Sequence, residues 1–147
     1  MGISIETVEH GDPGWSDCVA IRHEVFVVGQ ECPPDEEFDR QDAEAHHLLL
    51  RVDGRPAATA RWRVTGVGNQ AVAKLERFAV LEAFRGRGLG RQLVQSALDT
   101  ARGAGHGRFL LHAQAHLRGF YAAFGFRAVG TPFVEAGIPH LRMLFDD

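Results

Sequence analysis

Apolar positions recur at two different spacings along the chain, which predicts alternating strands and helices. Residues 3–8 predict a short first strand, and residues 11–14, with two glycines and a proline, predict a turn. A helix is expected next, capped by Ser16 or Asp17 and carrying apolar residues as far as Val27. The start of the chain is therefore interpreted as strand, turn and helix.

The middle of the chain is expected to contain a loop followed by strands. Residues 30–44 are polar and include two consecutive prolines, which predicts a long and mostly irregular loop. A β-hairpin is then expected from residues 47–52 and 56–64, with Gly54 in its turn. After a further turn, a strand is predicted over residues 71–80.

The C-terminal half is expected to add helices and strands in alternation. One helix, which ends at Gly103 and Gly105, has an apolar face at three- and four-residue spacing. The residues of this face are Leu89, Leu93, Val94, Ala97, Leu98 and Ala101. The elements expected after it are a strand over 108–113, a helix over 117–124 ended by Gly125, and closing strands over 126–129 and 141–145. Together these elements predict an α/β (α+β) fold, a mixed sheet with helices on both faces.

An Arg-Gly-Arg-Gly-Leu-Gly run, Arg85 to Gly90, lies between the strand over 71–80 and the helix that follows. A helix start leaves backbone N–H groups without partners and carries a partial positive charge, so it suits phosphate oxygens. The three glycines permit close approach, and the interleaved arginines add cationic donors. A plain strand-to-helix turn is the alternative, but the pattern favours a phosphate-bearing ligand.

Two familiar phosphate motifs fit this run poorly. A nucleoside-triphosphate loop needs Gly-Lys-Ser/Thr, but Gly90 is followed by Arg91 and Gln92. A dinucleotide fingerprint needs a third glycine where this chain has Arg91. The first ligand class is excluded, and the second is only weakly supported.

Length and charge narrow the functional classes. The 147 residues suffice for one domain, spanning 1–147, with a sizeable apolar core. Net charge is −3, and the 16 Lys and Arg residues, of which only Lys74 is a lysine, are scattered, so no nucleic-acid partner is indicated. Cys18 and Cys32 are too few for a disulfide framework and are expected to be reduced. No signal sequence or apolar run of ~20 residues is recognisable, which favours a cytoplasmic protein without a membrane partner.

Two motifs at compatible spacing carry a family resemblance. Residues 80–90 resemble the acetyl-CoA-binding motif of the GNAT superfamily of N-acetyltransferases, whose core is Arg/Gln-x-x-Gly-x-Gly/Ala, with its fixed positions at Arg85, Gly88 and Gly90. Residues 120–126 are similar to the family's second signature, an aromatic Tyr-x-x-x-Gly-Phe helix end. Further stretches that resemble the ElaA-type subgroup are residues 25–47, 113–114 and 137–143. The resemblance covers nearly the whole chain and implies a mixed, mostly antiparallel central sheet.

The resemblance implies acetyl-CoA as the co-substrate and no metal. The pyrophosphate of CoA would lie on backbone N–H groups of the glycine-rich run, and its pantetheine arm along the strand end, where a backbone N–H near Phe78 would face the thioester oxygen. Gln114 stands where many members carry an asparagine that contacts CoA. The implied CoA-binding residues are Phe78, Ala79, Val80, Arg85, Gly86, Arg87, Gly88, Leu89, Gly90, Arg91 and Gln114.

The same resemblance implies direct transfer of an acetyl group to a primary amine. Tyr121 is the only tyrosine and falls where the family places its general acid; a phenol with the usual pKa near 10 is protonated at neutral pH. For the base, Glu76 lies two residues before Phe78 and shares its face if no bulge intervenes. In the catalytic interpretation, Glu76, His112 or His140 activates a water that acts as the base. In the structural interpretation, Glu76 forms an ion pair and each histidine is a hydrogen-bonded residue of a strand.

Other groups of side chains carry less weight. His112 and His116 are four residues apart, but they lack a catalytic glutamate and span a strand end, so no metal is expected. His46 and His47 should point to opposite faces of a strand, one exposed and one buried. A covalent acetyl-cysteine route is disfavoured, because neither cysteine is near the thioester strand in sequence.

The acceptor stays open between small-molecule and peptide amines. The acidic residues between Asp35 and Glu44 either attract a cationic amine or form a solvated loop. A non-catalytic acyl-CoA-binding sensor and a dinucleotide-binding module are the competing functions. The final strand is a candidate edge for a homodimer.

Overall fold

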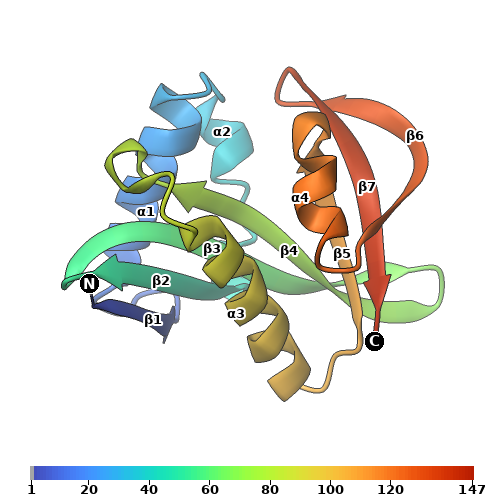
Figure 1. The fold of residues 1–147 in the computed structure, drawn as a ribbon, viewed down its shortest axis with the longest axis horizontal. Coiled ribbons are helices and arrows are strands. Elements are labelled where there is room, and N and C mark those ends of the chain that lie inside the picture. Colours follow the sequence, from blue (N-terminus) through green and yellow to red (C-terminus); the bar gives the residue numbers. More distant parts are fainter. Residues whose placement is uncertain (1) are drawn as a thin grey trace.

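A seven-stranded sheet crosses the molecule in the order β1-β2-β3-β4-β5-β7-β6 (Figure 1). The structure is a computed structural model and describes residues 2–147. The strands are β1 (Ile3–Val8), β2 (His46–Val52), β3 (Arg55–Val67), β4 (Gln70–Val80), β5 (Arg108–Gln114), β6 (Arg127–Glu135) and β7 (Ile138–Asp146). Neighbouring strands are antiparallel except β4 and β5, which are parallel. The predicted mixed, mostly antiparallel sheet is confirmed.

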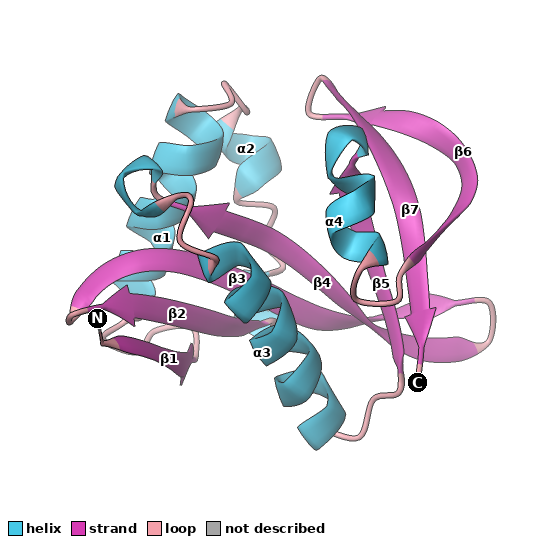
Figure 2. Ribbon diagram, in the orientation of Figure 1, coloured by secondary structure: helices cyan, strands magenta, loops and turns pink. Residues whose placement is uncertain are grey.

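Helices cover both faces of the sheet, as predicted (Figure 2). One face carries α3 (Leu89–Gly103) and α4 (Arg118–Ala122), and the other carries α1 (Trp15–Arg22), the π-helical turn η1 (His23–Val28) and α2 (Pro34–Glu37). Short 3₁₀ turns are η2 (Asp42–Glu44), η3 (Glu82–Phe84) and η4 (Ala115–Leu117). Within residues 2–147, no helix has the length and apolar character needed to cross a membrane.

The helix α3 supplies much of the core on its face of the sheet. All six residues of its predicted apolar face are buried, because their spacing places them along one side of a regular helix. They pack against strand residues such as Leu75, Phe109 and Leu111. The helix ends where predicted, and Gly105 has a φ of 96°, which a glycine adopts without strain.

Strands β4 and β5 separate along most of their length. They pair only at Ala73↔Phe109 and Lys74↔Leu110. Figure 2 shows the two strands close together near these residues and diverging toward the end of β4. From Leu75 to Val80, one edge of β4 therefore has no strand partner, and its backbone groups face an opening in the sheet.

A β-bulge interrupts β4 in the same region. Thr59↔Ala79 and Arg61↔Glu76 are paired, so Arg77 and Phe78 both lie opposite the single residue between Thr59 and Arg61. Arg77 has a φ of 59°, in the left-handed region. The bulge reverses the side-chain alternation. Phe78 packs against the core on the α4 face, whereas Glu76 faces the side covered by α1 and α2.

Two predictions for the N-terminal half need correction. The first helix starts at Trp15 without a side-chain cap from Ser16 or Asp17, because the turn bond from the Trp15 N–H to the Asp12 carbonyl already directs the chain into it. Residues 30–44 are irregular over much of their length, as predicted, but they are not simply a solvated loop. They form α2 and η2, and their acidic residues Glu37 and Asp42 are buried.

The C-terminal strands are longer than the predicted 126–129 and 141–145. β6 includes Pro132, which falls at a register shift on an edge strand, where a missing N–H breaks no ladder bond. The predicted helix 117–124 is shorter, because η4 replaces its first turn. β7 lies between β5 and β6, so the edges are β1 and β6, and the prediction that the final strand offers an edge is wrong.

Candidate active site

The glycine-rich run forms a tight approach to the N-terminus of α3. Gly86 and Gly88 have φ of 80° and 77°, and Gly88 is the N-cap of the helix. No side chain caps the helix and no acidic residue occupies its first turn. A Cβ built at Gly86 or Gly88 would meet no atom within 4 Å, so space lies open over the run. The first N–H groups of α3 can therefore donate hydrogen bonds to an anion.

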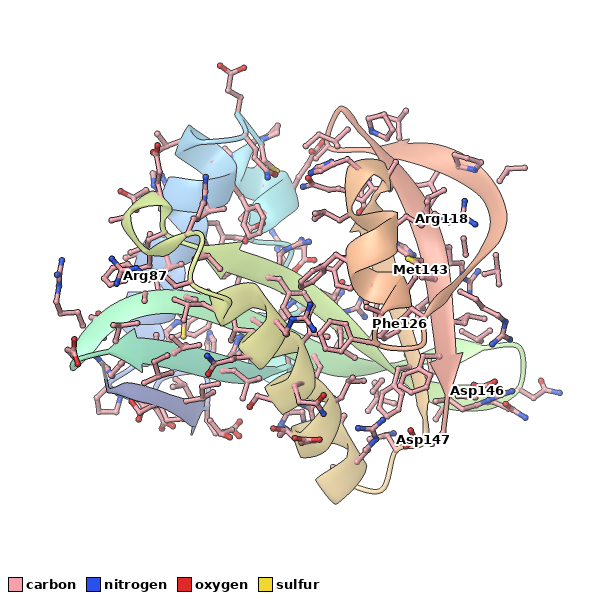
Figure 3. All side chains as sticks on the ribbon, viewed as in Figure 1. Arg87, Arg118, Phe126, Met143, Asp146 and Asp147 are labelled. Carbon is pink, nitrogen blue, oxygen red and sulfur yellow. The ribbon has the colours of Figure 1, made fainter. Side chains whose placement is uncertain are left out.

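The arginines of this run are exposed and lie around it. The Arg85 Nε donates to the Val80 carbonyl at 3.0 Å, which ties the run to the end of β4. The guanidinium of Arg87, labelled in Figure 3, lies 5.4 Å from the centroid of the Phe84 ring. Arg91 is on the exposed side of α3. Positive charge thus surrounds the helix start, as the sequence predicted.

We expect Gly88→Ala to lower the free energy of unfolding by about 1–2 kcal/mol, because an alanine pays that cost in the left-handed conformation. Gly90→Ala is the matched control, since its added methyl lies at an ordinary 3.8 Å from Phe120 and its φ is not positive. Urea unfolding of both variants measures the difference. Equal stability of the two variants would contradict the strained geometry assigned to Gly88.

A pocket of about 440 Å³ opens where β4 and β5 separate. Its lining comes from η1 and α2 on one side, from β4 and β5 along its floor, and from α4, β6 and β7 on the other side. The residues used below are Cys32, Glu76, Phe78, His112, Gln114, Tyr121, Glu135 and His140. The opening thus connects the α3 and α4 face with the face covered by α1 and α2.

Tyr121 lines the pocket where β4 and β5 separate. Its residue is 7% exposed, its ring centroid is 6.2 Å from that of Phe78, and it lines the pocket. Burial raises the pKa of Tyr121 to about 12. The phenol therefore stays protonated through the neutral range and is available as a proton donor.

Glu76 is held by cations. Its carboxylate lies 3.2 Å from Arg61, 2.6 Å from Arg63 and 3.2 Å from Lys74. Burial acts to raise the pKa of Glu76, but Arg61, Lys74 and Arg63 lower it on balance. The bulge separates its side chain from that of Phe78, so the expected shared face is absent. Glu76 borders the pocket mainly as the centre of an ion-pair cluster.

Buried ion pairs attach residues 30–44 to the sheet. Asp42 accepts hydrogen bonds from Arg22 at 2.7 Å and from Arg61 at 2.8 Å, and both arginines are almost fully buried. The guanidinium of Arg77 at the bulge pairs with Glu37 at 3.0 Å and with Asp39 at 3.1 Å. These acidic side chains are therefore already neutralised, which argues against their attracting an amine.

Gln114 and Cys32 both line the pocket. The Gln114 amide donates to the side-chain oxygen of Gln30 at 3.2 Å, which links the end of β5 to the segment after η1. Cys32, distant from the thioester strand in sequence, lies in the same pocket. Burial, together with the carboxylates of Glu37 and Glu36, raises the pKa of the Cys32 thiol. A thiolate nucleophile is therefore disfavoured here.

His112, Glu135 and His140 meet at the β6–β7 side of the pocket. The Nδ1 of His112 is 3.3 Å from Glu135, and the Nε2 of His140 is 3.7 Å from it. Sequence reasoning missed Glu135. The structure places it opposite Ile138, across the Ala136-Gly137 turn, where both residues have positive φ as in a two-residue hairpin.

The other histidines singled out in the sequence, His46, His47 and His116, are not part of this group. His47 is fully buried and His46 is half-exposed, as predicted for neighbours on one strand. His116 is exposed and is not among the pocket residues. In the described part of the chain, no cluster of three or more His, Cys, Asp or Glu residues has the arrangement of a metal site.

Known proteins share this architecture and sequence. A family model described as "Acetyltransferase (GNAT) domain" matches residues 21–146. The chain belongs to this family. A relative from Bacillus subtilis, the "uncharacterized N-acetyltransferase YjcF", is 34% identical over 131 residues, which is 88% of this chain and 91% of that protein.

Solved structures support the same membership. An acyl-CoA N-acyltransferase from Pseudomonas aeruginosa superposes with a TM-score of 0.86 at 33% identity, covering 98% of this chain and 99% of that one. Escherichia coli ElaA superposes with a TM-score of 0.84 at 30% identity, covering 99% and 100%. This GNAT domain is therefore similar to ElaA over its full described length, as the sequence resemblance indicated.

Proposed function

We propose that this GNAT domain is an acetyl-CoA-dependent N-acetyltransferase that transfers the acetyl group directly from the thioester to a primary amine. The observation that carries the proposal is the opening between β4 and β5, where a pocket is lined from both faces of the sheet, close in sequence to the glycine-rich helix start that follows β4. A cofactor and an acceptor can thus meet from opposite faces of the sheet.

In this proposal CoA occupies the α3 and α4 face. The N–H groups and arginines from Arg85 to Arg91 bind the pyrophosphate, and the unpaired edge of β4 at Phe78–Val80 binds the amides of pantetheine. The backbone N–H of Phe78, at the bulge, stabilises the oxyanion of the tetrahedral intermediate. Gln114 contributes its amide from the end of β5.

Tyr121 acts as the general acid. Its protonated hydroxyl donates to the departing thiolate, and it forms no hydrogen bond to another described residue that would have to be broken first. Because its lowered pKa makes Glu76 a weak proton acceptor, it does not itself remove the proton of the amine. It supports this deprotonation by holding a water and a negative charge at the pocket floor. We place the protein in the cytoplasm, where acetyl-CoA is made and used.

Acetyl-CoA consumption across a panel of amines tests the proposal, with acetyl-CoA binding measured separately. We expect Arg85→Ala to weaken acetyl-CoA binding about tenfold or more, the loss of one charge-assisted hydrogen bond. Arg127→Ala, which removes an exposed arginine of β6, should bind normally. Unchanged affinity in Arg85→Ala would refute the phosphate site, and tight binding without turnover on any amine would favour an acyl-CoA sensor.

A further inference from the structure

The cluster at the β6–β7 side of the pocket is built from three strands. His112 comes from β5, Glu135 from the end of β6 and His140 from β7, which pairs with β5 at Gln114↔His140 and with β6 at Phe133↔His140. The ring of Phe133 stacks on His140 with centroids 5.9 Å apart and meets the edge of His112 at 5.0 Å. The three polar side chains are thus held in place by the hairpin.

Hydrogen bonds define which nitrogen of His140 carries a proton. Its Nδ1 is 2.7 Å from the Ile138 carbonyl, and a carbonyl oxygen only accepts, so Nδ1 is the donor. In the neutral ring, Nε2 then carries a lone pair. Nε2 faces the Glu135 carboxylate at 3.7 Å, and this carboxylate is also an acceptor. In this form both groups are acceptors, so one ligand with two N–H donors can bridge them.

The second oxygen of Glu135 is held differently. Oε1 of Glu135 accepts from the Nδ1 of His112 at 3.3 Å. The hydrogen bond from His112 lowers the pKa of Glu135, which keeps its carboxylate ionised at neutral pH. Glu37, Asp39 and Glu76 pair with arginines or lysine, whereas the ion-pair partners of Glu135 in the described chain are histidines. The charge of Glu135 therefore remains available to a cationic ligand.

We propose that Glu135 and the Nε2 of His140 together bind the ammonium of the acceptor, and that His140 takes its proton. This proposal rests on the proposed function and names its substrate class, an aliphatic primary amine that is protonated in solution. An ammonium carries several N–H donors and can donate to both acceptors at once. An arylamine, which is neutral at pH 7, would need neither the carboxylate nor the base.

The steps balance in atoms and charge. One N–H bond of the ammonium breaks, and its proton forms an N–H bond on His140, whose imidazolium is then stabilised by Glu135. The neutral amine attacks the thioester carbon. As the intermediate collapses, the C–S bond breaks, the thiolate receives the Tyr121 proton, and the proton lost from the new amide nitrogen leaves through water and restores Tyr121. His140 returns its proton to solvent.

Several charged groups surround this pair and contribute to its pH dependence. Lys74 and Glu76 lie on β4 at the pocket floor, and Glu36 lies on α2 across the pocket. Arg142 on β7 is paired with His112 in the sheet register. The pH dependence of a reaction at this pair will therefore depend on Glu135, His112 and these four groups together.

The first experiment needs no known acceptor. Imidazole ¹⁵N spectra of the parent should show His140 with its proton on Nδ1, and adding n-butylammonium chloride should shift the Nε2 resonance. Tetramethylammonium chloride, which has no N–H donor, should not shift it, and Glu135→Gln should abolish the n-butylammonium response. A proton on Nε2 of neutral His140, or equal responses to both cations, would overturn the proposal even if acetyl-CoA binds normally.

The second experiment uses any amine that the acetyl-CoA screen identifies. His140→Asn keeps a donor for the Ile138 carbonyl and removes Nε2; we expect kcat/KM to fall about 10²-fold, with acetyl-CoA affinity unchanged and the acid limb of the pH profile lost. His23→Asn, at an exposed position of η1, is the control and should match the parent. A parent-like pH profile in His140→Asn would overturn the base role, whereas loss of acetyl-CoA binding in the parent would count against the proposed function itself.

Discussion

Tyr121→Phe is expected to lower kcat about 10³-fold, within the range for loss of a general acid, while acetyl-CoA affinity stays within about twofold of the parent. The ring packs among Phe78, Phe120 and Phe126, and phenylalanine keeps those contacts. Only the hydroxyl is removed, and it forms no hydrogen bond within the described chain. Steady-state rates at saturating acetyl-CoA, with a separate binding titration, measure the change.

The pH dependence gives a second check on Tyr121. Because burial raises its pKa to about 12, the acid stays protonated up to strongly alkaline pH. We therefore expect that deprotonation of Tyr121 does not lower kcat of the parent between pH 8 and 10. The parent and Tyr121→Phe should show the same pH dependence in this range. A basic limb in that range that is lost in the variant, or unchanged kcat in Tyr121→Phe, would rule out the assigned role.

Asp42→Ala is expected to destabilise the fold by about 3–5 kcal/mol, the cost of removing one partner from a buried ion pair. Its carboxylate is the shared acceptor for Arg22 and Arg61, which are 1% and 0% exposed. Without it, two buried guanidinium groups lose a counter-charge together. Urea unfolding of parent and variant measures the loss.

An exposed pair supplies the control for Asp42. Asp146 pairs with Arg108 at 3.0 Å with both side chains substantially exposed, so Asp146→Ala should cost less than about 1 kcal/mol. Similar losses in the two variants would contradict the assignment of the buried cluster.

The same cluster predicts that the fold loses stability in acid. Burial acts to raise the pKa of Asp39, but the hydrogen bond and charge of Arg61 lower it to about 2. The stabilisation is therefore complete above the unfolded value near 4 and is lost as pH falls toward 2.

Periodicity predicted those parts of the fold in which burial follows hydrophobicity. The six apolar residues of α3 are buried as expected, and the β2–β3 hairpin with Gly54 in its turn is present. The glycine-rich run was also recognisable, because positive φ at Gly86 and Gly88 requires residues without a Cβ.

The errors lie where polar residues are buried through pairing or where the backbone departs from regular spacing. Acidic residues of 30–44 were taken as solvent-exposed, since their partners Arg22 and Arg61 are distant in sequence. The bulge at Arg77 has no sequence signature, because arginine rarely adopts a positive φ and is stabilised there by contacts to Glu37 and Asp39. Glu135 became visible only once β6 and β7 were paired.

The contacts of Arg77 also limit how this enzyme can be redesigned. Its backbone shapes the strand proposed to hold the thioester, and its side chain contacts Glu36, Glu37 and Asp39, which line the pocket proposed for the acceptor. Transplanting residues 30–44 from a relative, in order to change the acceptor, would therefore also disturb the thioester strand. The proposed acceptor pocket and the proposed thioester strand are therefore coupled through Arg77. A successful graft would have to carry Arg61 and Arg77, or their local equivalents, together with the loop.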